Sequence, residues 1–183
     1  MNINCSNIGY QQSPSFNGRV DKKSAKLAKE IGGSALENLQ NLAGNTSKNT
    51  VLKLNEMGSD IGIYAYNQKT GHGLTVGLAS KENLGRTVGS LVGKNVDQGI
   101  INASVRNIKE AAISGPLNTT EKKFLRQEVK DTLAMQREVG VKMPFWSETK
   151  QLMAEADRRA DLERIADSKN YHAWKMSMCN DML

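Results

Sequence analysis

Apolar and polar positions at the start of the chain repeat with a helical period. Between residues 21 and 31, small or apolar side chains recur every three or four positions and lysines occupy the other side. The pattern predicts an amphipathic helix with Asp21 as its N-cap. Two adjacent glycines, Gly32-Gly33, are expected to end it, since each costs about 1 kcal/mol in a helix. A second helix is expected over residues 34–44.

The pattern then changes to alternation, which predicts strands over residues 51–57, 60–67 and 73–80. Short turns join these segments, so we expect a three-stranded antiparallel meander. Tyr64 and Tyr66 fall on one face of the second strand, and the other face is expected to be buried under helices. The side chains expected to face inward are Ile61, Ile63 and Ala65, and on the third strand Leu74, Val76 and Leu78.

A helical period returns after the strands and predicts one long helix over residues 80–112. Gly85, Gly89 and Gly93 recur every fourth residue within it. Three glycines would cost a helix roughly 3 kcal/mol relative to alanine. We therefore expect another element to pack closely against this glycine face.

The rest of the chain is predicted to be helical. Asn118 and Glu121 have the spacing of an N-cap pair ahead of a helix that extends through Glu138. A last helical region is expected from Phe145 toward Met178, with a break near Ser168. These helices are predicted to form a C-terminal helical hairpin.

The predicted fold class is α+β, with a three-stranded antiparallel meander covered by helices. With 183 residues, the chain is long enough for one core and short for two ordinary domains. We expect a disordered leader over residues 1–19 and a single domain over 20–183. Within that domain, residues 20–117 would form a helix-meander-helix core and residues 118–183 a helical C-terminal region.

The amino-terminal residues lack the pattern of a cleaved signal peptide. The segment MNINCSNIGYQQSPSFNG has no charge before Arg19 and is rich in Asn, Ser and Gln. In composition it resembles the unfolded leaders of type III secreted effectors from bacteria. The chain contains no stretch of about 18 consecutive apolar residues, so no membrane span is expected. The expected localisation is cytoplasmic, and the resemblance implies secretion without a cleaved signal peptide as the alternative.

The chain is basic, with 25 Lys and Arg against 19 Asp and Glu. The densest patch is on the first predicted helix and consists of Lys22, Lys23, Lys26 and Lys29. Nucleic-acid binding surfaces interleave such cations with aromatic rings, and no aromatic residue lies between Phe16 and Tyr64. We therefore expect a solvated helix face, and nucleic-acid binding that is weak and non-specific.

Few residues in the sequence point to catalysis. His172 and Cys179 are seven positions apart on a predicted helix and form a candidate thiol–imidazole pair. A catalytic pair would still need a third group to orient the imidazole, so the pair favours an enzyme only weakly. The Cys and His spacings match no metal site, and no cofactor motif is present, so neither a metal nor a cofactor is expected.

Aromatic residues are concentrated near the C-terminus, where Phe145, Trp146, Tyr171 and Trp174 occur. Aromatic side chains anchor many protein interfaces. Packing of the C-terminal helices onto the sheet through the same residues is the alternative that the scarcity of large side chains elsewhere in the chain favours. The expected function is a non-enzymatic protein-interaction module that binds a protein partner through this helical surface. A secreted effector with another activity and a weak nucleic-acid binder are the alternatives. The sequence does not determine the oligomeric state.

Overall fold

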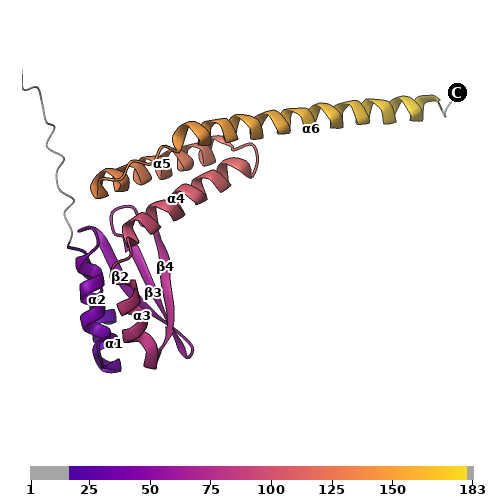
Figure 1. The fold of residues 1–183 in the computed structure, drawn as a ribbon. Helices are drawn as coiled ribbons and strands as arrows, with labels where there is room; N and C mark the ends of the chain where they lie inside the picture. The colour runs from indigo at the N-terminus through magenta and orange to yellow at the C-terminus, as the bar shows by residue number, and fades with distance from the viewer. Residues whose placement is uncertain (1–16, 181–183) are drawn as a thin grey trace, which may run out of the picture. The chain divides into compact units, whose positions relative to one another are not determined.

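The chain forms two compact units, of which one contains a sheet and the other is helical. The structure is a computed structural model that describes residues 17–180, with side chains through residue 172. The sheet unit comprises Met1–Ser104 and Thr132–Met143, and the helical unit comprises Val105–Asp131 and Pro144–Leu183. The α+β class is confirmed (Figure 1). Each unit is built from two separate segments of the chain, and the single domain predicted over 20–183 stays a prediction.

The sheet has four strands in the order β1-β2-β3-β4. The predicted strands are confirmed within one residue, but the purely antiparallel three-stranded sheet is wrong. The additional strand, β1, is too short for alternation to predict it. It pairs in parallel with β2, whereas the other strand pairs are antiparallel. The strand bounds are β1 (Arg19–Val20), β2 (Thr50–Met57), β3 (Asp60–Asn67) and β4 (Gly73–Ser80).

The residues just before β1 belong to the sheet unit. The amides of Asn17 and Gly18 donate hydrogen bonds to the carbonyl of Thr46 at 3.0 and 3.1 Å. A Cβ atom at Gly18 would lie 2.0 Å from the Thr46 Oγ1 atom, so only glycine permits this approach. The disordered leader predicted over 1–19 therefore extends too far, because residues 17–19 are ordered. Residues 1–16 of that leader lie outside the described residues.

Three helices of the sheet unit follow the predicted capping pattern in part. They are α1 (Lys22–Ile31), α2 (Ala35–Gly44) and α3 (Leu84–Leu91), the last preceded by a 3₁₀ turn, η1 (Lys81–Asn83). The Asp21 carboxylate accepts hydrogen bonds from the amides of Lys23 and Ser24 at 3.1 and 3.2 Å, which confirms this N-cap. Ser34 precedes α2 but makes no capping hydrogen bond through its side chain.

The long helix predicted over residues 80–112 is two helices, α3 and α4 (Val96–Ile113). The break includes Gly93, whose φ of 153° lies outside the helical region. Gly85 and Gly89 do lie on a closely packed face. A Cβ at Gly85 would be 2.8 Å from Ser34 Oγ, and a Cβ at Gly89 would be 3.0 Å from Asn38 Nδ2. The predicted close approach is confirmed for these two glycines, and α2 provides it.

The two faces of the sheet have different environments. The face that carries Leu52, Ile61 and Ile63 is fully buried, and α1, α2 and α3 pack on the strands. A register shift after Ile63 places Leu74 opposite Ala65 and Leu78 opposite Gly62. The prediction that Leu74, Val76 and Leu78 share one face is therefore wrong. The other face, called the open face below, carries Arg19, Lys53, Asn55, Met57, Tyr64, Tyr66, Thr75 and Leu78.

The helical unit contains the later part of α4, the earlier part of α5 (Thr119–Val139), and α6 (Trp146–Asn180). Asn118 caps α5 by accepting hydrogen bonds from the amides of Thr120 and Glu121, and the Glu121 carboxylate accepts one from the amide of Asn118. This confirms the predicted cap pair. The break predicted near Ser168 is wrong, because α6 is continuous.

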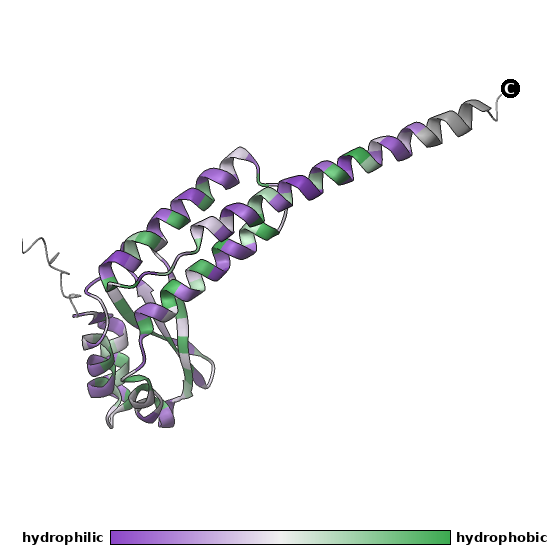
Figure 2. Ribbon diagram, turned by 45° about the horizontal axis from the view of Figure 1, so that its top comes forward, coloured by the Kyte–Doolittle hydropathy of each residue, from purple (hydrophilic) through white to green (hydrophobic). Residues whose placement is uncertain are grey.

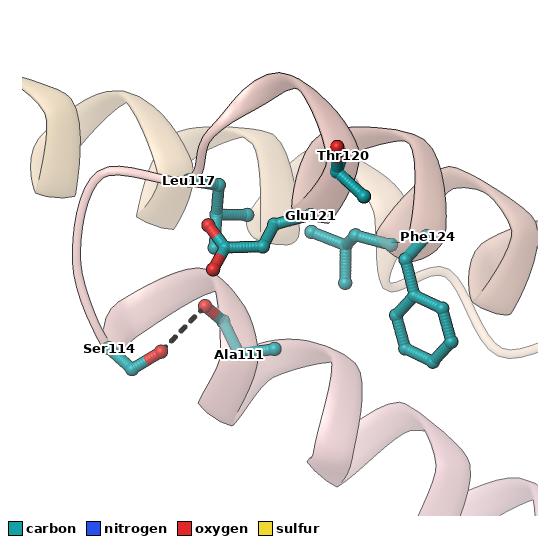
Figure 3. Close-up of a pocket in the computed structure, with 7 residues that line it drawn as sticks. Ala111, Ser114, Leu117, Thr120, Glu121 and Phe124 are labelled. Atoms are coloured by element: carbon teal, nitrogen blue, oxygen red, sulfur yellow. Dashed lines mark hydrogen bonds between the residues drawn. The ribbon is translucent and has the colours of Figure 1, made fainter.

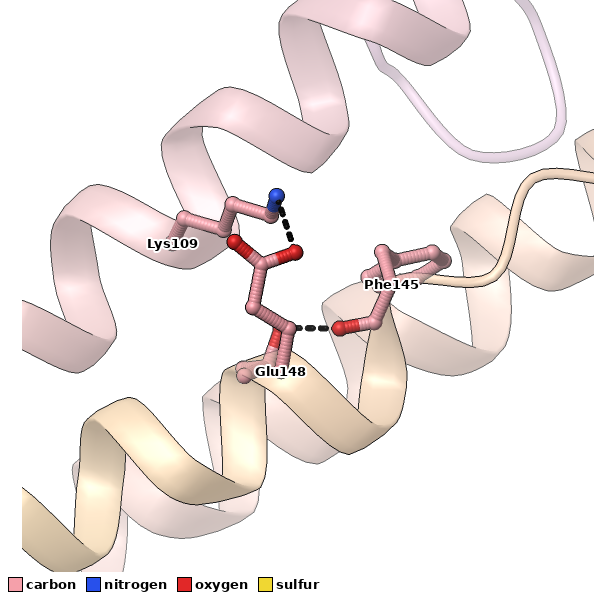
Figure 4. A network of polar contacts seen from close by, with 4 residues as sticks. Lys109, Phe145 and Glu148 are labelled. Carbon is pink, nitrogen blue, oxygen red and sulfur yellow. Dashed lines mark hydrogen bonds and ion pairs between the residues drawn. The ribbon is translucent and has the colours of Figure 1, made fainter.

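Ion pairs join the three helices within the helical unit. Lys109 of α4 contacts Glu148 of α6 at 2.7 Å (Figure 4), and Lys122 of α5 contacts Asp157 of α6 at 3.3 Å. The C-terminal helices thus pack with the end of α4 as a third helix. Among the described helices, none combines the length and apolar character that crossing a bilayer requires.

Candidate interaction surface

The four aromatic residues expected to form an interface do not share one surface. Phe145 is only 1% exposed, and its carbonyl accepts hydrogen bonds from the amide and hydroxyl of Thr149 at 3.0 and 2.9 Å (Figure 4). The Phe145 side chain is therefore covered in this structure, and its part in an interface stays a prediction.

The other three aromatic residues are distributed along α6. Trp146 is half-buried, and the ammonium of Lys150 lies 5.4 Å from its ring centroid. Tyr171 is exposed and meets the ring of His172 edge to face at 5.9 Å. The side chain of Trp174 lies outside the described residues. At about 1.5 Å per residue, Trp146 and Tyr171 are roughly 37 Å apart along the helix axis, so they cannot form a single patch.

The helical unit has an apolar hollow where α4 ends and α5 begins. Its volume is about 430 Å³. The phenyl ring of Phe124 lines it and is 67% exposed, although it is a large apolar group (Figure 3). The hydroxyl of Ser114 donates a hydrogen bond to the carbonyl of Ala111 at 3.0 Å, which closes the last turn of α4 beside the hollow. The lining residues are Ala111, Ser114, Leu117, Thr120, Glu121, Phe124 and Leu125.

The second exposed apolar region is the outer segment of α6, which we define as residues 161–172. Every side chain in this segment is exposed. Leu162 and Ile165 are 54% and 51% exposed, and their spacing of three places them on one helical face. In Figure 2, hydrophobic positions interrupt the hydrophilic ones along this helix. The outer segment therefore offers apolar side chains between charged ones.

Sequence analysis missed Phe124, Leu162 and Ile165. A signal for Phe124 was present, because it lies one position outside the apolar stripe of α5 that includes Leu125 and Val129. A large aromatic residue beside such a stripe is a candidate for exposure. No comparable signal marks Leu162, because its exposure depends on which parts of α6 find packing partners.

The basic residues of α1 are positioned as the sequence predicted. Lys22, Lys23, Lys26 and Lys29 are all exposed. Lys26 makes an ion pair with Glu30 at 3.7 Å across one helical turn. Exposed pairs of this kind contribute about 0.3–0.5 kcal/mol.

The two residues of the candidate thiol–imidazole pair, His172 and Cys179, both belong to α6. The side chain of Cys179 lies outside the described residues, so the pair stays a prediction.

A buried carboxylate was not anticipated from the sequence. Asp97 is 4% exposed and accepts hydrogen bonds from the Ser47 amide at 2.7 Å and the Thr50 hydroxyl at 2.5 Å. Burial raises the pKa of Asp97; hydrogen bonds from Thr50 and Ser47 oppose this, and the charge of Glu138 adds to it. The adjoining cavity holds only about 10 Å³, so Asp97 joins α4 to the segment before β2 instead of facing a substrate.

Comparison with protein-family models, with curated proteins and with solved structures finds no match. The function must therefore be argued from the surfaces themselves.

Proposed function

We propose that the chain is a non-enzymatic protein-interaction module that binds a protein partner through its helical unit. The observation that supports this proposal is Phe124, a phenyl ring 67% exposed beside an apolar hollow of about 430 Å³. Interfaces concentrate their binding energy in aromatic anchors and the pockets beside them. The hollow has room for one large apolar side chain, which a partner helix could insert next to Phe124.

The outer segment of α6 supports the same proposal. Leu162 and Ile165 expose about half of their surface on one face of the helix, and charges of both signs flank them, as with Asp161 and Arg164. An amphipathic helix with apolar residues at matching spacing is the partner that such a face fits best. The proposed partner is therefore helical and presents an apolar face bordered by mixed charges.

An enzymatic reading has less support. The buried carboxylate Asp97 has no room beside it for a substrate, because the adjoining cavity holds only about 10 Å³. A secreted bacterial effector would be one example of an interaction module, and its support is the composition of residues 1–18.

Site-directed photo-crosslinking tests the proposed surface. A benzophenone amino acid placed at position 124 or 162 is expected to capture a defined protein partner in cells. Matched probes at Arg126 and Asp167 are exposed and lie about 200° from Phe124 around α5 and from Ile165 around α6, so they should capture it poorly. Equal capture at all four positions would contradict the proposal.

The captured protein is then purified and its binding measured by calorimetry. Phe124→Ser is expected to weaken binding at least about tenfold, because a hot-spot aromatic contributes more than 1–2 kcal/mol. Arg126→Ser should bind as the unaltered chain does. Since Phe124 is exposed, its loss should leave the melting temperature nearly unchanged. Unaltered affinity in Phe124→Ser would rule out the hollow as the binding site.

A further inference from the structure

The open face of the sheet brings cations and aromatic rings together. Lys53 on β2 lies directly opposite Tyr64 on β3, and directly opposed side chains have Cβ atoms about 4.5–5.5 Å apart. Arg19 on β1 lies beside Val51, which lies opposite Tyr66. Each tyrosine therefore has a cation in its own row across the sheet. Arg19 and Lys53 are exposed, and both tyrosines are half-buried.

The two tyrosine rings form a platform. Their centroids are 5.9 Å apart and their planes differ by 23°. The Tyr64 ring leans over β4, where a Cβ at Gly73 would lie 2.5 Å from its hydroxyl oxygen and 2.7 Å from its Cζ atom. Glycine at position 73 thus leaves the space that this ring occupies. Both tyrosines are half-buried, so part of each side chain remains exposed on the open face.

A hollow of about 270 Å³ adjoins this platform, lined by Lys53, Asn55, Tyr64, Tyr66 and Gly71. No acidic residue belongs to this lining set. The strand register places Asp60 on the open face, opposite Met57; Glu56 follows Asn55 on the other side of β2, and Asp21 accepts hydrogen bonds at the start of α1. The positive charge of Lys53 helps to lower the pKa of Asp21. The hollow itself therefore presents a positive charge beside two aromatic rings.

A second hollow continues from the first around the exposed edge of β2. Asn55 lines both hollows, and the lining of the second hollow also includes Lys23 and Lys26 from α1. Its volume is about 410 Å³. The acids in its lining, Glu30 and Glu56, are paired with Lys26 and Lys81. The second hollow therefore holds two lysines and two acids, and of its lysines Lys23 is the one outside the Lys26–Glu30 pair.

We propose that the open face binds single-stranded nucleic acid. Two neighbouring bases stack on Tyr64 and Tyr66, and the phosphates contact Arg19 and Lys53. Proteins that bind single strands combine these features, a positive track with aromatic rings on which successive bases stack. Arg19 donates one hydrogen bond to Gln68, and the guanidinium has four further N–H donors for a phosphate. This site is separate from the surface of the helical unit.

The first test measures binding of fluorescent 12-nucleotide oligo-U and oligo-dT to the full chain at low salt. Tyr64→Leu and Tyr66→Leu, which keep an apolar side chain but remove the ring, are each expected to weaken binding at least about fivefold. Tyr64→Phe and Tyr66→Phe should retain it, because the ring remains. The matched control is Tyr171→Leu, an exposed tyrosine of the helical unit, which should leave affinity unchanged. The ratio of the two affinities shows whether RNA or DNA is preferred.

The salt dependence of binding tests the proposed phosphate contacts. Lys53→Gln is expected to reduce the log–log salt slope by about 0.7, the value for one phosphate contact on a single strand. Lys169→Gln, on the exposed part of α6, should not change it. Circular dichroism of each variant confirms that the fold is intact.

Three results would overturn the proposal. The first is no binding of either oligonucleotide at low salt. The second is binding that folded tyrosine-to-leucine variants leave unchanged, since charge alone would then account for it. The third is an acidic peptide that binds more tightly than the oligonucleotides and loses affinity in the same tyrosine variants, which would assign the face to a protein ligand.

Discussion

Strand β3 and helix α6 show two different relations between a side chain's position and its burial. In β3, Ile61, Ile63 and Ala65 are all fully buried, since alternate residues of a strand keep the same environment along its length. In α6, Ala156 is 3% exposed whereas Leu162 is 54% exposed. A helix satisfies its backbone hydrogen bonds internally, so it can continue beyond its packing partners. A strand needs neighbours on its edges. Apolar residues are therefore buried in the core in β3, whereas those of the outer segment of α6 are exposed.

The largest expected effect compares two aliphatic residues of these elements. Ile63→Ala should lower the free energy of unfolding by about 2–5 kcal/mol, because it leaves a cavity in the covered face of the sheet. Leu162→Ala should change it by less than about 0.5 kcal/mol, because its side chain is exposed. Denaturant titration followed by circular dichroism measures both. A loss above 1 kcal/mol in Leu162→Ala would show that α6 is covered in solution.

The next effect concerns packing between α2 and α3. Gly85→Ala should destabilise the sheet unit by about 1–3 kcal/mol, because its Cβ would approach the Ser34 hydroxyl and the Ala35 backbone. Gly89→Ala should be nearly neutral. Its Cβ meets the flexible end of Asn38, and the helix gains about 0.8–1 kcal/mol from alanine. Equal effects of the two substitutions in thermal unfolding would contradict this difference.

The pH dependence of stability separates two carboxylates of the sheet unit. Burial raises the pKa of Asp97 despite hydrogen bonds from Thr50 and Ser47. Its stabilising contribution is therefore complete below the unfolded pKa, near 3.8, and is lost as the pH rises through the folded pKa. The stability of the unaltered chain relative to Asp97→Asn should fall in that window, by at most about 1.4 kcal/mol per pH unit.

Asp21 provides the control of opposite sign. Burial alone would raise its pKa, but hydrogen bonds from Ser24 and Lys23 outweigh this and lower it. The stability that this cap provides is present above the unfolded pKa, near 3.8, and is lost as the pH falls through the folded pKa. The unaltered chain should therefore lose stability relative to Asp21→Asn on acidification. Unfolding measured between pH 2 and 8 should show opposite slopes for the two comparisons.

The smallest expected effect belongs to the helical unit. Lys109 and Glu148 are 2.7 Å apart, with side chains 30% and 57% exposed. A double-mutant cycle with Lys109→Ala and Glu148→Ala should give a coupling of about 0.2–1 kcal/mol, since water and salt screen exposed ion pairs. The coupling should decrease in 1 M salt, where the screening length is about 3 Å. A coupling that salt does not reduce would indicate a pair shielded from solvent.

Elements whose signals are local could be predicted from the amino-acid sequence. The strand limits followed from alternation within a few residues, and the caps at Asp21 and Asn118 followed from side chains that bond to amides two or three positions away. Of the candidate site, it indicated an exposed Tyr171 but not Phe124. The sequence pattern also did not show that Phe145 is buried, since a helical period does not reveal which aromatic residues are covered.

Only the tertiary structure decided the features that join distant residues. Lys53 and Tyr64 are eleven positions apart, and Arg19 is 32 positions from Val51, yet strand pairing places each couple side by side. Because these pairs form only when the strands pair, the linear sequence shows no aromatic residue close to the cations. The burial of Phe145 and the exposure of Leu162 were likewise decided by packing partners. Local pattern specifies the period of an element, whereas the pairing of elements depends on the free energy of contacts across the whole fold.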